Sequence, residues 1–168
     1  MAEALLRAHL DRLGVDARVH SAGTMPWGGS ATSAAIEVMG EYGLDITGHA
    51  STALTTALIE RSDLVLGMTR DHVGRVANLV PDAAERAFLA GELARLGAHT
   101  ARTADEPLRA WARRVARTRD DPRLVGRFHE EVADPVGEPI QVYRSTAARL
   151  DRDLRSVAQL LAERPAVL

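Results

Sequence analysis

The sequence predicts an α/β fold with a parallel sheet. Two short apolar runs, residues 63–68 and 86–90, have the length and composition of buried strands. Each lies beside a stretch with helical apolar spacing, and this alternation of strands and helices is typical of a parallel sheet. The length of 168 residues suits a single domain with a sizeable core, residues 1–168.

The first helix is expected from Met1 to Leu13. Leu6 and Leu10 recur with Leu13 at helical spacing, and Gly14 is a suitable stop. No capping residue precedes this helix and no strand leads into it, so its first N–H groups and its positive dipole end have no partner. In α/β proteins that end commonly faces an anion-binding loop fed by a strand. The sequence therefore reads as one that begins one strand and one loop too late.

Further elements are expected as far as residue 80. They are a short strand at 17–22, a helix from Thr32 or Ser33 to about Tyr42 with Gly43 as its stop, a short helix from Thr55 to Arg61, and a helix capped by Thr69 after the strand at 63–68. Threonine suits a helix start because its hydroxyl accepts a hydrogen bond from a backbone N–H of the first turn. Pro81 interrupts the last of these helices.

Residues 97–131 form a helical, arginine-rich segment. Leu108, Trp111 and Val115 mark the apolar face of one helix, and the arginines are expected mostly on its solvated face. A surface for an acidic or phosphorylated partner is the alternative interpretation.

The chain closes with a long helix that is predicted from about Pro139 and ended by Pro165. Its apolar residues step by four and three: Tyr143, Ala147, Leu150, Leu154, Val157 and Leu161. This spacing predicts packing along a single seam.

Composition excludes several classes of protein. Apolar residues at 46% and charged residues at 26% are ordinary globular values, and no apolar run approaches the length of a membrane span. With no signal-peptide pattern, we expect a cytoplasmic protein with no membrane contact. The formal net charge of −2 predicts no general attraction to nucleic acid.

Two residue types are absent. The chain has no lysine, and it has no cysteine, which excludes disulfides, thiolate metal sites and a thiolate nucleophile within it. The six histidines are scattered, without a close pair suited to a metal. We predict no metal and no cofactor.

Asp134 is a candidate for a chemical role. It precedes Pro135 in a loop just before the last helix, and Pro135 removes an N–H and fixes the backbone. An aspartate held in this way can be aimed at a substrate, although an ordinary turn aspartate is the simpler interpretation. Ser21, His49 and Asp134 are the residue types of a hydrolase triad, but Ser21 lacks the Gly-x-Ser-x-Gly elbow, so no triad is expected.

Seven motifs together resemble the low-molecular-weight protein tyrosine phosphatases. They occur in the family's order and approximate spacing: Met1-Ala-Glu-Ala-Leu-Leu-Arg7, Ser21-Ala-Gly-Thr24, Ala35-Ile-Glu-Val38, Gly43-Leu-Asp-Ile-Thr-Gly-His49, Asp63-Leu-Val-Leu66, Met68-Thr-Arg-Asp-His72 and Asp134-Pro135. Each motif alone is weak, but together they cover nearly the whole chain outside the arginine-rich segment. The resemblance implies helices on both faces of the sheet, with the family's first, central strand missing from this sequence.

The resemblance also implies a mechanism. In that family a strand delivers a Cys-x5-Arg phosphate loop into the first helix, and the thiolate attacks phosphorus to form a phosphocysteine. An aspartate in an Asp-Pro loop protonates the leaving phenol and then activates water. By this resemblance Asp134 is the general acid and base. Trp27 would bind the substrate as an aromatic wall, although a packing tryptophan is an equally good interpretation, and Val136 stands where the family usually has an aromatic residue.

The implied substrates are phosphotyrosine proteins or small aryl phosphates. Loss of a hydrolase nucleophile costs on the order of a million-fold in rate, so the chain as given is predicted to be inactive. Three interpretations stay open: a sequence begun at an internal methionine of an active phosphatase, a truncated relative that binds a partner or a phosphorylated ligand without turnover, and an arsenate reductase-like enzyme on the same fold.

Overall fold

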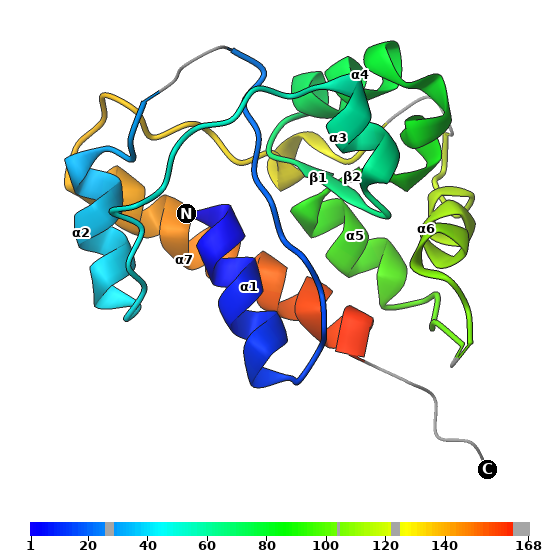
Figure 1. The fold of residues 1–168 in the computed structure, drawn as a ribbon. Helices are drawn as coiled ribbons and strands as arrows, with labels where there is room; N and C mark the ends of the chain where they lie inside the picture. Colours follow the sequence, from blue (N-terminus) through cyan, green and yellow to red (C-terminus); the bar gives the residue numbers. More distant parts are fainter. Residues whose placement is uncertain (26–28, 104, 122–124, 163–168) are drawn as a thin grey trace.

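The computed structural model describes residues 1–25, 29–103, 105–121 and 125–162 (Figure 1). The elements in chain order are α1 (Ala2–Arg12), α2 (Ser33–Glu41), α3 (Thr56–Arg61), β1 (Val65–Gly67), α4 (Arg70–Leu79), the 3-10 helix η1 (Pro81–Arg86), β2 (Ala87–Leu89), α5 (Ala90–Gly97), α6 (Leu108–Ala116), the 3-10 helix η2 (Phe128–Glu130) and α7 (Ile140–Ala162). Among these elements, no helix has the length and the apolar content needed to cross a membrane.

The sheet lies where the two apolar runs predicted it. β1 pairs with β2 in parallel, with Val65 opposite Ala87 and Gly67 opposite Leu89. The chain passes between them through α4 and η1, which is the helical crossover that parallel strands require. The predicted α/β class with a parallel sheet is therefore confirmed.

Helices cover both faces of this sheet. Phe88 is fully buried in a cluster with side chains of α5, α6 and α7, whereas Ala87 and Leu89 are buried in a cluster with α3 and α4. Successive side chains of a strand point to opposite faces, so β2 contributes to two cores. The covering of both faces that the family resemblance implied is confirmed.

The long last helix supports much of the molecule. α1, α2 and α5 all pack against α7 (Figure 1). The buried residues of α7 are Tyr143, Ala147, Leu150, Leu154, Val157 and Ala158. The predicted apolar seam is thus confirmed from Tyr143 to Val157, whereas Leu161 is only partly buried. Pro165, the predicted stop, lies outside the described residues.

The predicted helix starts and stops are also confirmed. The hydroxyls of Thr32, Thr55 and Thr69 accept hydrogen bonds from backbone N–H groups in the first turns of α2, α3 and α4, at 3.2–3.4 Å. Gly14 and Gly43 follow α1 and α2 with φ angles of 66° and 72°. Glycine adopts this left-handed backbone without steric cost, which explains the two helix ends.

The strand predicted at residues 17–22 is wrong. This segment has no ladder partner, and the nearest pairing is an isolated parallel bridge between Gly23 and Ala53. The carbonyl of Val19 accepts a hydrogen bond from the Arg7 side chain, at 3.2 Å, instead of from a neighbouring strand. Alternating apolar residues become a strand only beside a partner, and in Figure 1 the segment runs between α1 and the sheet without joining it.

Candidate functional site

The first turn of α1 carries a polar cluster around Glu3. Its carboxylate accepts hydrogen bonds from the Ser21 hydroxyl and the Arg7 guanidinium, and one of its oxygens lies 4.0 Å from Nδ1 of His49. Ser21 and His49 belong to two motifs of the family pattern that lie far apart in the sequence. The fold brings both motifs to the same end of α1.

This cluster favours the charged form of Glu3. Burial by itself would raise the pKa of this carboxyl, but the hydrogen bonds from Ser21 and Arg7 and the positive charge of Arg7 hold the pKa below its ordinary value. A carboxylate in the first turn also interacts favourably with the positive end of the helix dipole. Glu3 therefore joins Ser21 to the first turns of α1, where it also pairs with Arg7.

Asp134 lies on a loop that is attached to the end of β1. The N–H of Val132 donates to the carbonyl of Met68 at 2.8 Å, and Pro135 is buried. Val132 also belongs to the buried cluster against which Met1 packs. Residues just before Asp134 are therefore fixed in the same core as the beginning of α1.

The Asp134 carboxylate itself is exposed. Its Oδ1 accepts a hydrogen bond from the N–H of Val136 at 3.0 Å, the geometry of an Asx turn, and Val136 is 64% exposed. The turn orients one carboxylate oxygen of a side chain that is exposed. The role of Asp134 as general acid and base stays a prediction.

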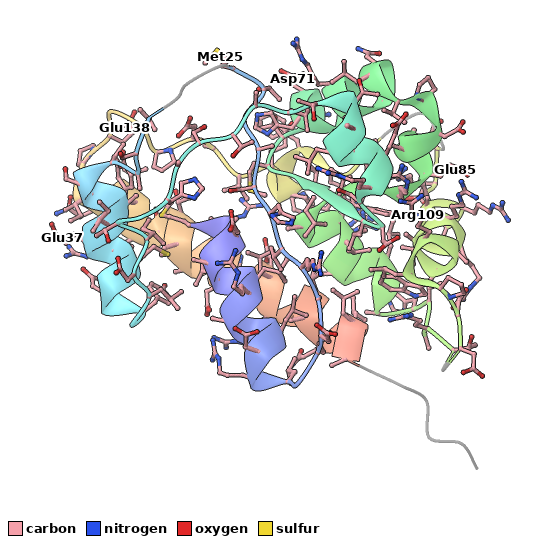
Figure 2. The ribbon with its side chains drawn as sticks, in the orientation of Figure 1. Met25, Glu37, Asp71, Glu85, Arg109 and Glu138 are labelled. Atoms are coloured by element: carbon pink, nitrogen blue, oxygen red, sulfur yellow. The ribbon has the colours of Figure 1, made fainter. Side chains whose placement is uncertain are left out.

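The loop that contains Trp27 is fixed at both ends. Gly23 bridges Ala53, and the N–H of Ser51 donates to the carbonyl of Gly29 at 3.1 Å. Trp27, the predicted aromatic wall, lies outside the described residues. Met25 in the same loop is 61% exposed, and Figure 2 shows it along the same edge of the molecule as Glu138, which belongs to the loop after Asp134.

Ser21, His49 and Asp134, which have the residue types of a hydrolase triad, contact other groups of the chain. The Ser21 hydroxyl donates a hydrogen bond to Glu3, while Asp134 accepts one from the N–H of Val136. His49 faces Glu3 across 4.0 Å. These bonds agree with the expectation that the three residues do not form a triad.

The arginine-rich segment is only partly a solvated surface. On α6 the side chains of Arg109, Arg113 and Arg114 are 41–47% exposed, as predicted, and each pairs with a carboxylate of this chain. Arg119 departs from the prediction because its side chain is only 6% exposed and is bonded to Glu92. The interpretation of the arginines as a solvated face is therefore wrong for Arg119.

Sequence reasoning missed the side chains that hold the site together. Glu3 lies inside one of the seven motifs, yet nothing in the sequence indicated that it would meet Ser21 and His49. Glu131 was also missed: its carboxylate accepts hydrogen bonds from the N–H and from Nε of Arg70, at 2.9 and 3.1 Å. Both carboxylates join segments more than fifteen residues apart, a relation that local spacing does not encode.

Known proteins are similar to this sequence. The protein-arginine-phosphatase of Bacillus subtilis is 29% identical over 162 residues, which cover 96% of this chain and 87% of that protein. The low-molecular-weight protein-tyrosine-phosphatase Etp of Escherichia coli K12 is 31% identical over 91 residues, 54% of this chain and 59% of that protein.

Solved structures give the same result. A mutant of YwlE from Bacillus subtilis superposes with a TM-score of 0.71 at 28% identity, over 96% of this chain and 88% of that chain. The low-molecular-weight protein tyrosine phosphatase of T. tengcongensis superposes with a TM-score of 0.69 at 28% identity, over 94% and 87% of the two chains.

A sequence model described as low molecular weight phosphotyrosine protein phosphatase matches residues 1–120. That match ends before Asp134, and none of the 168 residues is a cysteine, so the family's thiolate nucleophile is absent from this chain. The match nevertheless covers well over half of the sequence. The chain belongs to the low-molecular-weight phosphotyrosine protein phosphatase family.

Proposed function

We propose that this fold serves the hydrolysis of phosphate esters on proteins, with Asp134 as the general acid and base, in a form that carries the family's Cys-x5-Arg loop. The observation that supports this most directly is the attachment of the Asp134 loop to the end of β1 through Val132 and Met68. The carboxyl ends of parallel strands are where α/β folds bind their ligands. The 168 residues of this chain contain no cysteine, so we expect them not to turn over substrate.

The proposed reaction has two steps. The thiolate attacks phosphorus while the bond from phosphorus to the leaving oxygen breaks, and Asp134 gives its proton to that oxygen. Water then attacks the phosphocysteine, Asp134 takes a proton from it, and the sulfur–phosphorus bond breaks. Trp27 would lie against the aromatic ring of the substrate. The cytoplasm remains its proposed location.

The experiment compares the 168-residue chain with a chain extended before Met1 by a strand and a Cys-x5-Arg loop of the family pattern. Only the extended chain should release phosphate from phenyl phosphate. In the extended chain Asp134→Asn should lower kcat by about 10²- to 10⁴-fold, the usual contribution of a general acid. Phenol is a poor leaving group, so its departure depends on the proton.

Asp45→Asn is the matched control. Asp45 is also exposed and also closes an Asx turn, with its Oδ1 accepting from the N–H of Thr47 at 2.8 Å. This control should leave kcat unchanged. If Asp134→Asn has no greater effect than Asp45→Asn, Asp134 is not the general acid. If the 168-residue chain itself releases phosphate, the reaction does not use cysteine.

Phosphoarginine proteins are a second candidate substrate class. The relative that matches over 87% of its own length is a protein-arginine-phosphatase. Val136, rather than an aromatic residue, also follows Asp134-Pro135. The ratio of kcat/KM for a phosphotyrosine peptide and a phosphoarginine peptide of the same sequence, measured on the extended chain, decides between the two classes.

A further inference from the structure

A polar pair joins α1 to α7 in the interior of the molecule. Nε2 of His9, on α1, lies 2.8 Å from Oδ1 of Asp151, on α7. The His9 side chain is 4% exposed and the Asp151 side chain is 16% exposed. An ionised carboxylate only accepts hydrogen bonds, so the proton between the two side chains lies on Nε2. The imidazole is therefore a buried donor whose acceptor belongs to another helix.

The same two helices also share apolar contacts. Leu5 of α1 is buried in one cluster with Leu150 and Leu154 of α7. Burial of apolar surface is non-directional, so leucines alone allow one helix to slide or rotate slightly on the other. A hydrogen bond requires a narrow range of distance and angle. The His9–Asp151 bond therefore selects one register of α1 on α7.

Stability alone does not explain a polar pair at this place. Taking polar and charged groups out of water costs free energy, so replacing a buried pair by apolar residues of similar volume is often neutral or stabilising. The best-attested use of such groups is the choice of one register between packed helices. The position of the pair in the fold shows what this register controls.

The two helices carry the two parts of the proposed site. The start of α1 follows the Cys-x5-Arg loop in the extended chain, and the loop of Asp134 leads directly into α7. At 1.5 Å per residue, His9 lies about 10 Å along α1 from its first residue, and Asp151 lies about 17 Å along α7 from its first residue. A shift of one helix on the other therefore changes the distance between Asp134 and the start of α1.

We propose that His9 and Asp151 form a positioning pair, which sets the register of α1 on α7 and thereby the place of the start of α1 relative to Asp134. Neither side chain contacts the substrate, because each acts through its own helix. The effect on catalysis rests on the proposed function, whereas the register is a property of the 168-residue chain and is tested on it.

The test measures the register as a distance. Because the chain has no cysteine, Asp11→Cys and Glu138→Cys, both at exposed positions, supply two sites for spin labels without further changes. Double electron–electron resonance then gives the distribution of distances between α1 and the loop after Asp134. In the double variant His9→Leu/Asp151→Leu this distribution should broaden or shift, while the urea midpoint stays the same or rises.

A single change and a matched control accompany the double variant. His9→Leu alone should also broaden or shift the distribution, and Asp151 then keeps its hydrogen bond from Arg155. Glu41→Leu/Arg144→Leu is the control. It removes an exposed pair that joins α2 to α7, with 2.7 Å between Oε1 of Glu41 and Nη2 of Arg144, and it should leave the distribution unchanged.

Two results on the 168-residue chain would overturn the positioning pair. The first is a folded double variant, as judged by circular dichroism, whose distance distribution equals that of the unchanged chain. The second is loss of the fold in the double variant, because the pair would then be required for folding rather than for register.

The extended chain tests the consequence for catalysis. The double variant should lower kcat for phenyl phosphate on the order of 10²-fold, the cost of misplacing a reacting group by about 1 Å. An unchanged kcat beside a broadened distribution would overturn the effect on the site. A broadened distribution in a chain whose Asp134→Asn variant is fully active would contradict only the proposed catalytic role. An unchanged distribution beside an impaired Asp134→Asn variant would contradict only the positioning pair.

Discussion

Buried arginine–carboxylate pairs connect distant parts of the chain. The carboxylate of Glu92 is 1% exposed and accepts hydrogen bonds from Nε of Arg119 at 2.8 Å and from the N–H of Gly126 at 2.9 Å. The same guanidinium donates to the carbonyl of Ala87 at 2.7 Å and lies 4.7 Å from the centre of the Phe88 ring. One arginine of the arginine-rich segment is therefore part of the core around β2.

Glu92→Gln should destabilise the protein strongly. The change leaves the buried Arg119 guanidinium without a compensating charge, which typically costs about 3–5 kcal/mol. Urea unfolding at pH 7 measures the loss. Glu41→Gln, which breaks an exposed pair with Arg144, should leave the free energy of unfolding nearly unchanged. Equal effects of the two changes would show that burial does not set the strength of the Glu92 pair.

The elements of the fold are joined at close contacts that depend on small residues. At the end of β1, a Cβ added to Gly67 would lie 2.8 Å from Cγ2 of Val73 and 3.2 Å from Cβ of His72. This close approach lets α4 begin immediately beyond the strand. Gly74, on the exposed side of α4, has no such neighbour within 4 Å.

Gly67→Ala and Gly74→Ala should change stability in opposite directions. Gly67→Ala forces the start of α4 away from β1 and should cost about 1–3 kcal/mol. Gly74→Ala should stabilise the helix by about 0.5–1 kcal/mol, because alanine loses less backbone entropy than glycine. Thermal and urea unfolding of the two variants test the pair. If Gly67→Ala leaves the free energy of unfolding unchanged, β1 and α4 can separate without cost.

The short helix η2 should contribute stability that depends on pH. Burial alone would raise the pKa of Glu130, but hydrogen bonds from Arg95 and the N–H of Arg127, with the Arg95 charge, hold it below its ordinary value of 4.5. A carboxyl whose pKa is lower in the folded than in the unfolded state stabilises the protein above its unfolded pKa, and this contribution is lost as the pH falls through the folded pKa.

Glu130→Gln should therefore reduce the stability at pH 7 and flatten its fall between about pH 5 and pH 3. Urea midpoints at pH 7, 5 and 3.5 measure this difference. Glu138→Gln, at an exposed carboxylate of the Asp134 loop, is the comparison and should keep the original pH profile. A Glu130→Gln profile parallel to that of the unchanged chain would refute the linkage.

Across the whole molecule, α7 connects the hydrophobic clusters. Leu154 belongs to the cluster shared with α1 and α2, while Val157, one turn on, belongs to the cluster shared with α5 and α6. Both side chains are at most 1% exposed. Because one rigid helix contributes to both clusters, we expect them to unfold together.

Leu154→Ala should lower the free energy of unfolding by about 2–5 kcal/mol and keep a single transition. Far-UV circular dichroism reports on the helices. The fluorescence of Trp111, buried in the α6 cluster, reports on the other side of the molecule in a Trp27→Phe background. Transitions that do not coincide would show that the two clusters are separate folding units.

Local sequence encodes much of the secondary structure. Threonine caps at 32, 55 and 69, the glycine stops at 14 and 43, the two apolar runs and the seam of α7 all lie within a few residues of where they act, so they could be predicted. The family resemblance followed from motifs in order, and the Asp-Pro motif just before the last helix pointed to Asp134.

Tertiary contacts set which distant groups meet. The fold left residues 17–22 without a strand partner, placed Arg119 in the core beside Glu92, gathered Ser21 and His49 around Glu3, and left Phe128 exposed under Arg70. The physical reason is the separation along the chain over which each kind of interaction acts. Caps, stops and helical spacing depend on neighbours in the chain, whereas strand pairing, burial of charge and exposure of a side chain depend on what the rest of the fold brings beside them.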